Sequence, residues 1–340
     1  MKNHIIVATL AFTLLLSCNS DKDLLNQLNN YNIEMESQGY HFGDAIQLPK
    51  EVMKEAQSIS ISFGDKETSK LVIDPQFFTL GDNAVTFNIT KKNGEVLHQD
   101  ATINVFAKQP EQEVKYTIVK EYPHDANNFV QGFQLEGNII YESVGQLGMS
   151  QVMKYTLGTT TPSAATRQPD EIFSEGSTIV GDKVYQLTWQ HKKGFIYNKA
   201  DLALIKEFPY PNIMGEGWGL TYDGKHLIAS DGTKNLYFLN PDNPSQMVRY
   251  ISVAGNTQAY DRLNELEFHN GFIYAAVWQS PMVLKINPNN GEVVARFDFS
   301  TIAQKHTKGN DDVLNGIAFK GDNMLITGKN WNTIYEVAVQ

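Results

Sequence analysis

Positive charge is scarce in this 340-residue chain, which holds 28 Lys and Arg against 38 Asp and Glu and has a formal net charge of −10. That balance argues against nucleic acid, or an acidic membrane surface, as the main partner. Charged residues make up 19% of the chain and hydrophobic residues 41%, so it can fold around a core and does not have a disordered composition.

Motifs for metal and nucleotide chemistry are also missing. The eight histidines are scattered without His-x-x-x-His spacing, and there is no Gly-x-Ser-x-Gly motif or glycine-rich phosphate loop. The glycines around Trp218 lack the strand–helix context of a nucleotide site, and Asp311 and Asp312 favour a solvated loop over a cation site. We therefore expect no cofactor and no catalytic metal, and no ligand set predicts a structural calcium ion.

The chain has no apolar run near its start that is long enough for an ordinary transmembrane helix. Residues 5–16 are apolar, but 12 residues are too few, and they follow the charged Lys2 as in an export signal. The only cysteine, Cys18, comes directly after this run, and the sequence Leu15-Leu16-Ser17-Cys18 resembles a bacterial lipobox.

This resemblance implies a signal peptide over residues 1–17, lipidation of Cys18 and a place in the bacterial cell envelope, on either face of the membrane. The alternative is an ordinary signal peptide with an incidental cysteine. With Cys18 lipidated, no disulfide can form despite export. Residues 18–39, polar and Asn-rich in their first half, are expected to be a tether.

The C-terminal two thirds of the chain consist of a repeat. In each of five units a β-rich segment lies nine residues after an opening position, and successive openers are 44, 43, 46 and 51 residues apart. The openers are Gly132, Gly176, Gly219, Glu265 and Gly316. Self-similarity at this period is typical of β-propellers, so residues 114–340 are predicted to form a five-bladed β-propeller.

The end of the repeat indicates how the ring closes. Residues 118–123 resemble residues 204–209, which precede an opener, where the outermost strand of a blade is expected. The last repeat contains only three strand-like segments. We therefore expect the N-terminal segment 118–123 to be its fourth strand, which leaves few free edges.

The region before the repeat has a different pattern. Residues 58–63, 85–89 and 101–106 alternate apolar and polar side chains and are separated by turn signals. Residues 40–108 are therefore predicted to form a small Ig-like β-sandwich that serves as a spacer or docking module. Residues 109–113 are predicted to be a polar linker.

Stacking the repeats brings chemically useful side chains to two equivalent positions, which in a ring of blades lie on circles about the axis. The residues just before the openers are Gln131, Glu175, Trp218, Asn264 and Asn315. The residues 14 positions further on are Gly145, Trp189, Gly232, Trp278 and Lys329. One carboxylate, one lysine, amides and indoles on these circles predict a small-molecule pocket, whereas the alternative is that the indoles pack between blades and Glu175 is solvated.

These motifs resemble those of the plant-type glutaminyl-peptide cyclotransferases, which also occur in bacteria. The similarity covers residues 115–339 in order and includes Phe129-Val130-Gln131-Gly132 and residues 141–145, 173–176, 216–220, 230–232, 263–267, 312–318 and 327–331. One departure is Val130, where the family often has threonine. The resemblance implies a five-bladed propeller that converts N-terminal glutamine to pyroglutamate with loss of ammonia and without catalytic zinc.

The resemblance also implies roles for individual residues. Glu175 would be the catalytic acid and base. The pocket would be lined by Phe129, Gln131, Phe173, Trp189, Trp218, Asn264, Trp278 and Lys329. The expected partners are peptides or proteins with N-terminal glutamine, and the protein is expected to be a monomer.

Two other functions stay open on the residues alone. A non-catalytic lipoprotein could use the same ring to bind a peptide or glycan, with affinity but no turnover. A propeller lyase or lactonase would need a metal held on the axis by several histidines or carboxylates, whereas the two circles contain one glutamate.

Overall fold

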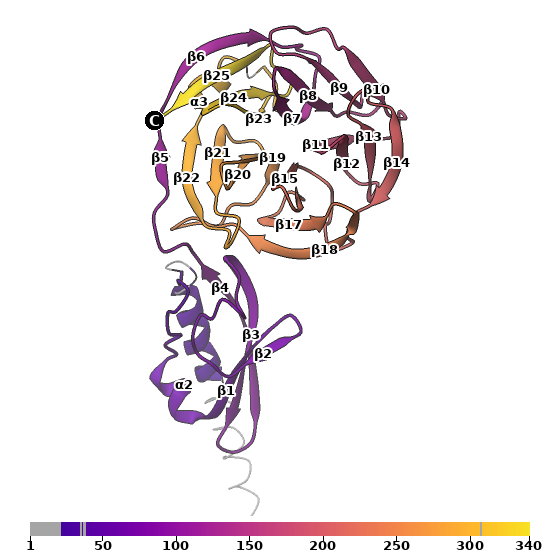
Figure 1. Ribbon diagram of the computed structural model, residues 1–340. Helices are drawn as coiled ribbons and strands as arrows, with labels where there is room; N and C mark the ends of the chain where they lie inside the picture. Colours follow the sequence, from indigo (N-terminus) through magenta and orange to yellow (C-terminus); the bar gives the residue numbers. More distant parts are fainter. Residues whose placement is uncertain (1–21, 35, 37–38, 307) are drawn as a thin grey trace, which may run out of the picture. The chain divides into compact units, whose positions relative to one another are not determined.

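The computed structural model describes residues 22–34, 36, 39–306 and 308–340 (Figure 1). The chain divides into two compact units, with the boundary between Lys108 and Gln109. The predicted signal peptide and Cys18 lie outside the described residues. Within the described ranges, no helix has the length and apolar character required to cross a membrane.

The N-terminal unit contains one four-stranded antiparallel sheet in the order β2-β1-β3-β4. Its strands are β1 (Ala56–Phe63), β2 (Lys66–Thr68), β3 (Gly81–Lys91) and β4 (Val96–Val105). Buried and exposed residues alternate along β3, where Val85, Phe87 and Ile89 point to the core. A short helix, α2 (Lys50–Glu55), precedes β1.

A helix accompanies this sheet where the sequence analysis predicted a tether. Residues 22–34 are helical, Leu28 is fully buried, and the Tyr31 and Tyr40 hydroxyls are 2.7 Å apart. The described residues of this unit thus form one sheet and helices, and the Ig-like pair of sheets predicted for residues 40–108 does not appear among them. Leu24, Leu25, Leu28 and Tyr31 recur with helical spacing, which allows a helix to meet an alternating sheet.

The C-terminal unit contains five sheets that follow one another along the chain. The first consists of β7 (Val130–Glu136), β8 (Ile139–Val144), β9 (Gln151–Thr156) and β10 (Ala164–Arg167). The second consists of β11 (Ser174–Val180), β12 (Lys183–Thr188), β13 (Lys193–Asn198) and β14 (Leu204–Pro209). The third consists of β15 (Leu220–Tyr222), β16 (Leu227–Ser230), β17 (Asn235–Asn240) and β18 (Asn243–Ser252).

The last two sheets recruit strands from the start of the unit. The fourth consists of β19 (Leu263–His269), β20 (Phe272–Val277), β21 (Met282–Ile286), β22 (Val293–Asp298) and the parallel strand β5 (Gln112–Val114), and the helix α3 (Ser300–Ala303) follows β22. The fifth consists of β23 (Leu314–Lys320), β24 (Asn323–Gly328), β25 (Thr333–Val339) and β6 (Tyr116–Pro123).

The five sheets are arranged in a ring (Figure 1). The first strands of consecutive sheets contact one another in a cycle that runs through β7, β11, β15, β19 and β23 and returns to β7. Clusters of buried hydrophobic side chains lie between neighbouring sheets, and one of them joins Phe133 and Ile140 of the first sheet to Leu325 and Ile334 of the fifth. Hydrophobic burial therefore acts around the whole ring.

The predicted pairing of the N-terminal segment with the last repeat is confirmed. β6 pairs antiparallel with β25, and Glu121 lies opposite Tyr335. The polar linker predicted for residues 109–113 is partly wrong, because β5 adds to the edge of the fourth sheet, with Glu113 opposite Arg296. Main-chain pairing with β22 accounts for this extra strand, and side-chain patterning carries no signal for it.

Close approach of the inner strands explains the glycine openers. A Cβ atom at Gly132, Gly176 or Gly219 would collide with the backbone of the adjacent inner strand. The fourth opener, Glu265, is the exception, and its buried carboxyl accepts a hydrogen bond from the Phe133 amide at 3.3 Å. Burial, and secondarily the neighbouring Glu267, raise the pKa of Glu265 well above its usual range.

Candidate active site

The residues at the two predicted positions lie at one end of the sheets. The first position is at the start of each inner strand, and the second follows the end of the next strand, to which the inner strand is antiparallel. Ser174 pairs with Thr188, Leu263 with Val277, and Leu314 with Gly328. Glu175 and Trp189, Asn264 and Trp278, and Asn315 and Lys329 are therefore brought to the same end of the ring.

Glu175 is a buried carboxyl group with an unusual titration. The residue is 5% exposed, and its Oε2 atom has no hydrogen-bond partner among the described residues. Burial raises the pKa of Glu175 to about 8, the nearby Lys329 opposes this effect, and Glu216 adds to it. Such a group exchanges a proton near neutral pH, which is the property required of an acid and base catalyst.

Lys329 is the buried cation that faces this carboxyl group. It is 3% exposed, and its Nζ atom lies 4.6 Å from the centre of the Phe129 ring. Burial lowers the pKa of Lys329 to about 8, while the charges of Glu175 and Asp311 act in the opposite direction. The mutual effect on pKa indicates that Glu175 and Lys329 share one electrostatic environment.

Aromatic rings form two groups around these charges. The Phe129 and Phe173 centroids are 6.1 Å apart, and those of Phe173 and Trp189 are 5.7 Å apart. In the second group the Trp218 and Trp278 centroids are 5.6 Å apart, with their planes nearly perpendicular. Edge-to-face contacts of this kind hold rings in defined orientations.

Glu216 joins the two aromatic groups and was not assigned a role in the sequence analysis. Its Oε2 atom accepts hydrogen bonds from the indole nitrogens of Trp189, at 2.6 Å, and Trp218, at 2.9 Å, and Oε1 accepts one from Gln190 at 3.2 Å. Burial works against ionisation of Glu216, but these hydrogen bonds outweigh it and lower its pKa. Its position two residues before Trp218, between two glycines, was the available signal.

The predicted amides occupy buried positions at the same end. Gln131 accepts a hydrogen bond through Oε1 from the Asn315 side chain at 2.9 Å, and Asn315 also donates to the Val130 carbonyl. The Oδ1 atoms of Asn264 and Asn315 are buried and have no partner in the described part of the chain. Unpaired buried acceptors are costly, so these atoms are suited to receive a hydrogen bond from a ligand.

The glycines at the second position provide room for rings. A Cβ atom at Gly145 would lie 2.7 Å from the Phe173 ring and 2.9 Å from the Gln131 side chain. At Gly232 it would lie 2.7 Å from the Trp218 ring. The repeat therefore alternates large side chains and glycines so that neighbouring sheets interlock at this end.

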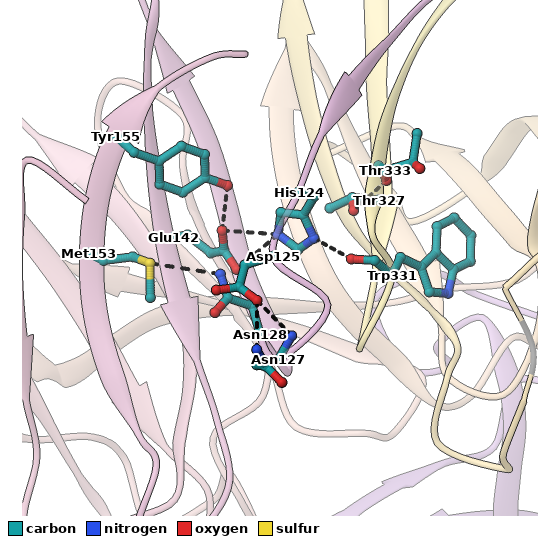
Figure 2. A network of polar contacts seen from close by, with 10 residues as sticks. All are labelled: His124, Asp125, Asn127, Asn128, Glu142, Met153, Tyr155, Thr327, Trp331 and Thr333. Carbon is teal, nitrogen blue, oxygen red and sulfur yellow. Dashed lines mark hydrogen bonds and ion pairs between the residues drawn. The ribbon is translucent and has the colours of Figure 1, made fainter. Parts of the chain in front are cut away.

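A polar network beneath the site was also missed by the sequence analysis (Figure 2). His124 Nδ1 lies 2.6 Å from the Trp331 carbonyl, and Nε2 lies 3.2 Å from both Glu142 oxygens. The Tyr155 hydroxyl donates to Glu142 at 2.5 Å. Burial alone would lower the pKa of His124, but the interactions with Glu142 and Trp331 outweigh it and raise the pKa.

This network, formed by His124, Glu142, Tyr155 and the Trp331 carbonyl, joins two segments that carry site residues. The His124 amide donates to the Asn332 carbonyl, and the Asn330 amide donates to the Asn128 carbonyl at 2.9 Å. Phe129 follows Asn128, and Lys329 precedes Asn330. The network therefore stabilises the relative position of the Lys329 ammonium and the Phe129 ring.

The described residues include no group of three or more His, Cys, Asp or Glu side chains placed to hold a metal ion. Each predicted residue of the described part thus has a location: Glu175, Lys329 and the five aromatic side chains are linked through ring contacts, hydrogen bonds and charge. Gln131 joins them at Gly145, where it packs next to Phe173. Asn264 lies at the equivalent position of the fourth sheet.

Comparison with known proteins places this site in a family. The glutamine cyclotransferase family model matches residues 91–339. The glutaminyl-peptide cyclotransferase of Arabidopsis thaliana is 35% identical over 229 residues, which are 66% of this chain and 71% of the plant protein. The crystal structure of Myxococcus xanthus glutaminyl cyclase superposes with a TM-score of 0.62 and 33% identity, over 68% of this chain and 98% of that chain. The chain therefore belongs to the glutamine cyclotransferase family.

Proposed function

We propose that this protein is a glutaminyl-peptide cyclotransferase built on a five-bladed β-propeller. It converts the N-terminal glutamine of peptides or proteins to pyroglutamate and releases ammonia. The observation that carries this proposal is the buried carboxyl of Glu175, with its pKa raised to about 8, next to Lys329 in a chain of this family. The ring of five sheets supports the propeller assignment.

The reaction is intramolecular, so positioning is a large part of catalysis. The α-amine of the substrate must approach the carbon of its own side-chain amide, and holding the folded side chain in that geometry removes much of the entropic barrier. Trp189, Trp218 and Trp278 would provide the surrounding shape. Glu216, which accepts hydrogen bonds from two of these indoles, would keep them in place.

Glu175 would move the proton. A neutral α-amine attacks the amide carbon and forms the new C–N bond, Glu175 gives its proton to the departing nitrogen, and it recovers a proton from the attacking nitrogen. The amide C–N bond breaks and ammonia leaves, so Glu175 ends as it began. Because a free α-amine has a pKa of about 8, close to that of Glu175, proton exchange between the two groups costs little.

The oxygen of the amide becomes negative during the attack and needs donors. Lys329 is the buried cation of the site, and Gln131 has a side-chain amide nearby; a well-placed donor contributes about 3 kcal/mol to such a transition state. Asn264 would contribute a further amide from the fourth sheet. The buried, unpaired Oδ1 of Asn264 could also accept a hydrogen bond from the substrate amine or amide.

Ammonia release from Gln-Ala, measured with and without a chelator, tests this function. We expect release by the wild type in both conditions and none by Glu175→Gln. Binding of Gln-Ala without turnover would favour the non-catalytic peptide- or glycan-binding lipoprotein. Turnover abolished by the chelator would favour metal chemistry, as in a propeller lyase or lactonase, over the metal-independent reaction proposed here.

We also propose that residues 1–17 are a lipoprotein signal and that the mature protein is anchored to the cell envelope by lipid on Cys18. The support is the apolar run before the only cysteine. Metabolic labelling with a radioactive fatty acid tests this, because Cys18→Ser should remove the label and release the protein from the membrane fraction. A monomer in solution is expected for the protein without its anchor.

A further inference from the structure

A second cavity lies next to the site and has no role in the reaction described above. Its volume is about 420 Å³, within the range of small-ligand sites. It is lined by three segments, residues 279–281, residues 300–304 and residues 309–314. The first connects β20 to β21 and the other two connect β22 to β23, so all of them lie at the end of the ring that carries Trp278 and Asn315.

The cavity shares a wall with the turn that carries Lys329. The Lys329 amide donates to the Val313 carbonyl at 2.9 Å, and the Trp331 indole donates to the Asp312 carbonyl at 3.1 Å. Asp312 and Val313 both line the cavity. On the opposite side Gln279 directly follows Trp278. The cavity is therefore adjacent to both Lys329 and Trp278.

The lining chemistry suits a peptide main chain. Side-chain amides come from Gln279, Gln304 and Asn310, and each amide offers both donors and an acceptor, as main-chain N–H and C=O groups require. The carboxylate in the lining, Asp312, already accepts hydrogen bonds from the amides of Lys308 and Gly309 and from Asn330. The lining therefore offers amides and no free carboxylate to a ligand.

We propose that this cavity is the subsite for the second and third residues of the peptide substrate. The inference rests on the proposed cyclotransferase function. Because the terminal glutamine reacts at Glu175, the rest of the peptide must leave the site along a wall, and the cavity beside Lys329 and Trp278 receives it. Two extended residues span about 7 Å, and the amide side chains bind their main chain without selecting side chains.

Kinetics with short and long substrates test the subsite. We would measure ammonia release from glutamine amide and from Gln-Ala-Ala-amide for the wild type, for Gln304→Trp, which fills the cavity, and for Gln304→Ala/Asn310→Ala, which removes two amides. Loss of two main-chain hydrogen bonds should lower kcat/KM for the tripeptide about tenfold, mainly through KM. Glutamine amide should be turned over within twofold of the wild-type rate by both variants.

Lys305→Trp is the matched control, since Lys305 is exposed on the same segment and does not line the cavity. It should leave both substrates unchanged. Equal effects of Gln304→Trp on the two substrates, or no effect on the tripeptide, would overturn the subsite while leaving the cyclotransferase function in place. Failure of the wild type to release ammonia from either substrate would overturn both.

Discussion

Glu175 and Lys329 are two buried, oppositely charged groups whose pKa values are moved toward each other, to about 8 in each case. Burial is the main cause for both, because it disfavours the charged form of each side chain. Their mutual attraction only partly restores their charges. The site therefore holds an acid and a base that both exchange protons close to neutral pH.

This relationship predicts a bell-shaped pH dependence of kcat/KM. Below about pH 8 the substrate α-amine is protonated and cannot attack, so activity falls on the acidic side. Above about pH 8 Glu175 loses the proton that the leaving nitrogen requires, and Lys329 loses its charge. Rates with Gln-Ala from pH 5 to 10.5 should peak near pH 8, whereas a flat profile between pH 6 and 10 would contradict these roles.

Glu175→Gln should lose activity and gain stability. Removal of the proton carrier should lower kcat by about 10² to 10⁴-fold. In the wild type the folded state keeps a proton on Glu175 that the unfolded state releases above about pH 4.5, so stability falls as pH rises from about 4.5 to 8. The variant lacks this cost and should be more stable at pH 7 by up to about 3 kcal/mol.

Urea unfolding at pH 5 and pH 7, together with ammonia release, measures both effects. Glu171→Gln is the matched control, since Glu171 is exposed close to Glu175 in the sequence. It should change neither activity nor stability appreciably. A folded Glu175→Gln enzyme with full activity would show that another group carries the proton.

Glu216→Gln should act on both shape and titration. It weakens the acceptor shared by Trp189 and Trp218, so KM should rise several-fold. It also removes a negative charge that raises the pKa of Glu175, so the alkaline limb of the pH profile should move to lower pH. Gln190→Ala, which removes only the exposed third donor to Glu216, should leave that limb in place.

His124→Ala should destabilise the fold more than Tyr155→Phe. It leaves the buried Glu142 carboxyl and the Trp331 carbonyl without their partner, which costs about 3 to 5 kcal/mol for a buried pair. Tyr155→Phe removes a single hydrogen bond to Glu142 and should cost about 1 to 3 kcal/mol. Urea unfolding at pH 6 would measure the order, and equal losses would contradict the central place of His124.

The contribution of His124 should also depend on pH. Its pKa is raised in the folded state, so the stabilisation is complete below the unfolded pKa, about 6.5, and is lost as pH rises through the folded value. The difference in unfolding free energy between wild type and His124→Ala should therefore shrink at alkaline pH. A difference that grows with pH would mean that the imidazole is buried in its neutral form.

The repeat phase was enough to locate most of the candidate site before any coordinates. Equivalent positions of successive repeats must lie at equivalent places in a ring, so Glu175, Trp218 and Lys329 could be grouped from spacing alone. The pairing of residues 118–123 with the last repeat was likewise visible, because the last repeat lacked a strand. Both inferences depend on periodicity, which a sequence records directly.

Other features depend on which surfaces meet, and a single sequence does not record that. The helix at residues 22–34 covers a sheet that was expected to meet a second sheet, and β5 joins an edge through main-chain pairing. Glu216 is a turn residue until two indoles are seen to donate to it. The sequence alone determined which residues gather at one end of the ring. Only the tertiary structure decided their protonation, since the pKa of Glu175 follows from the exclusion of water and the distances to Lys329 and Glu216.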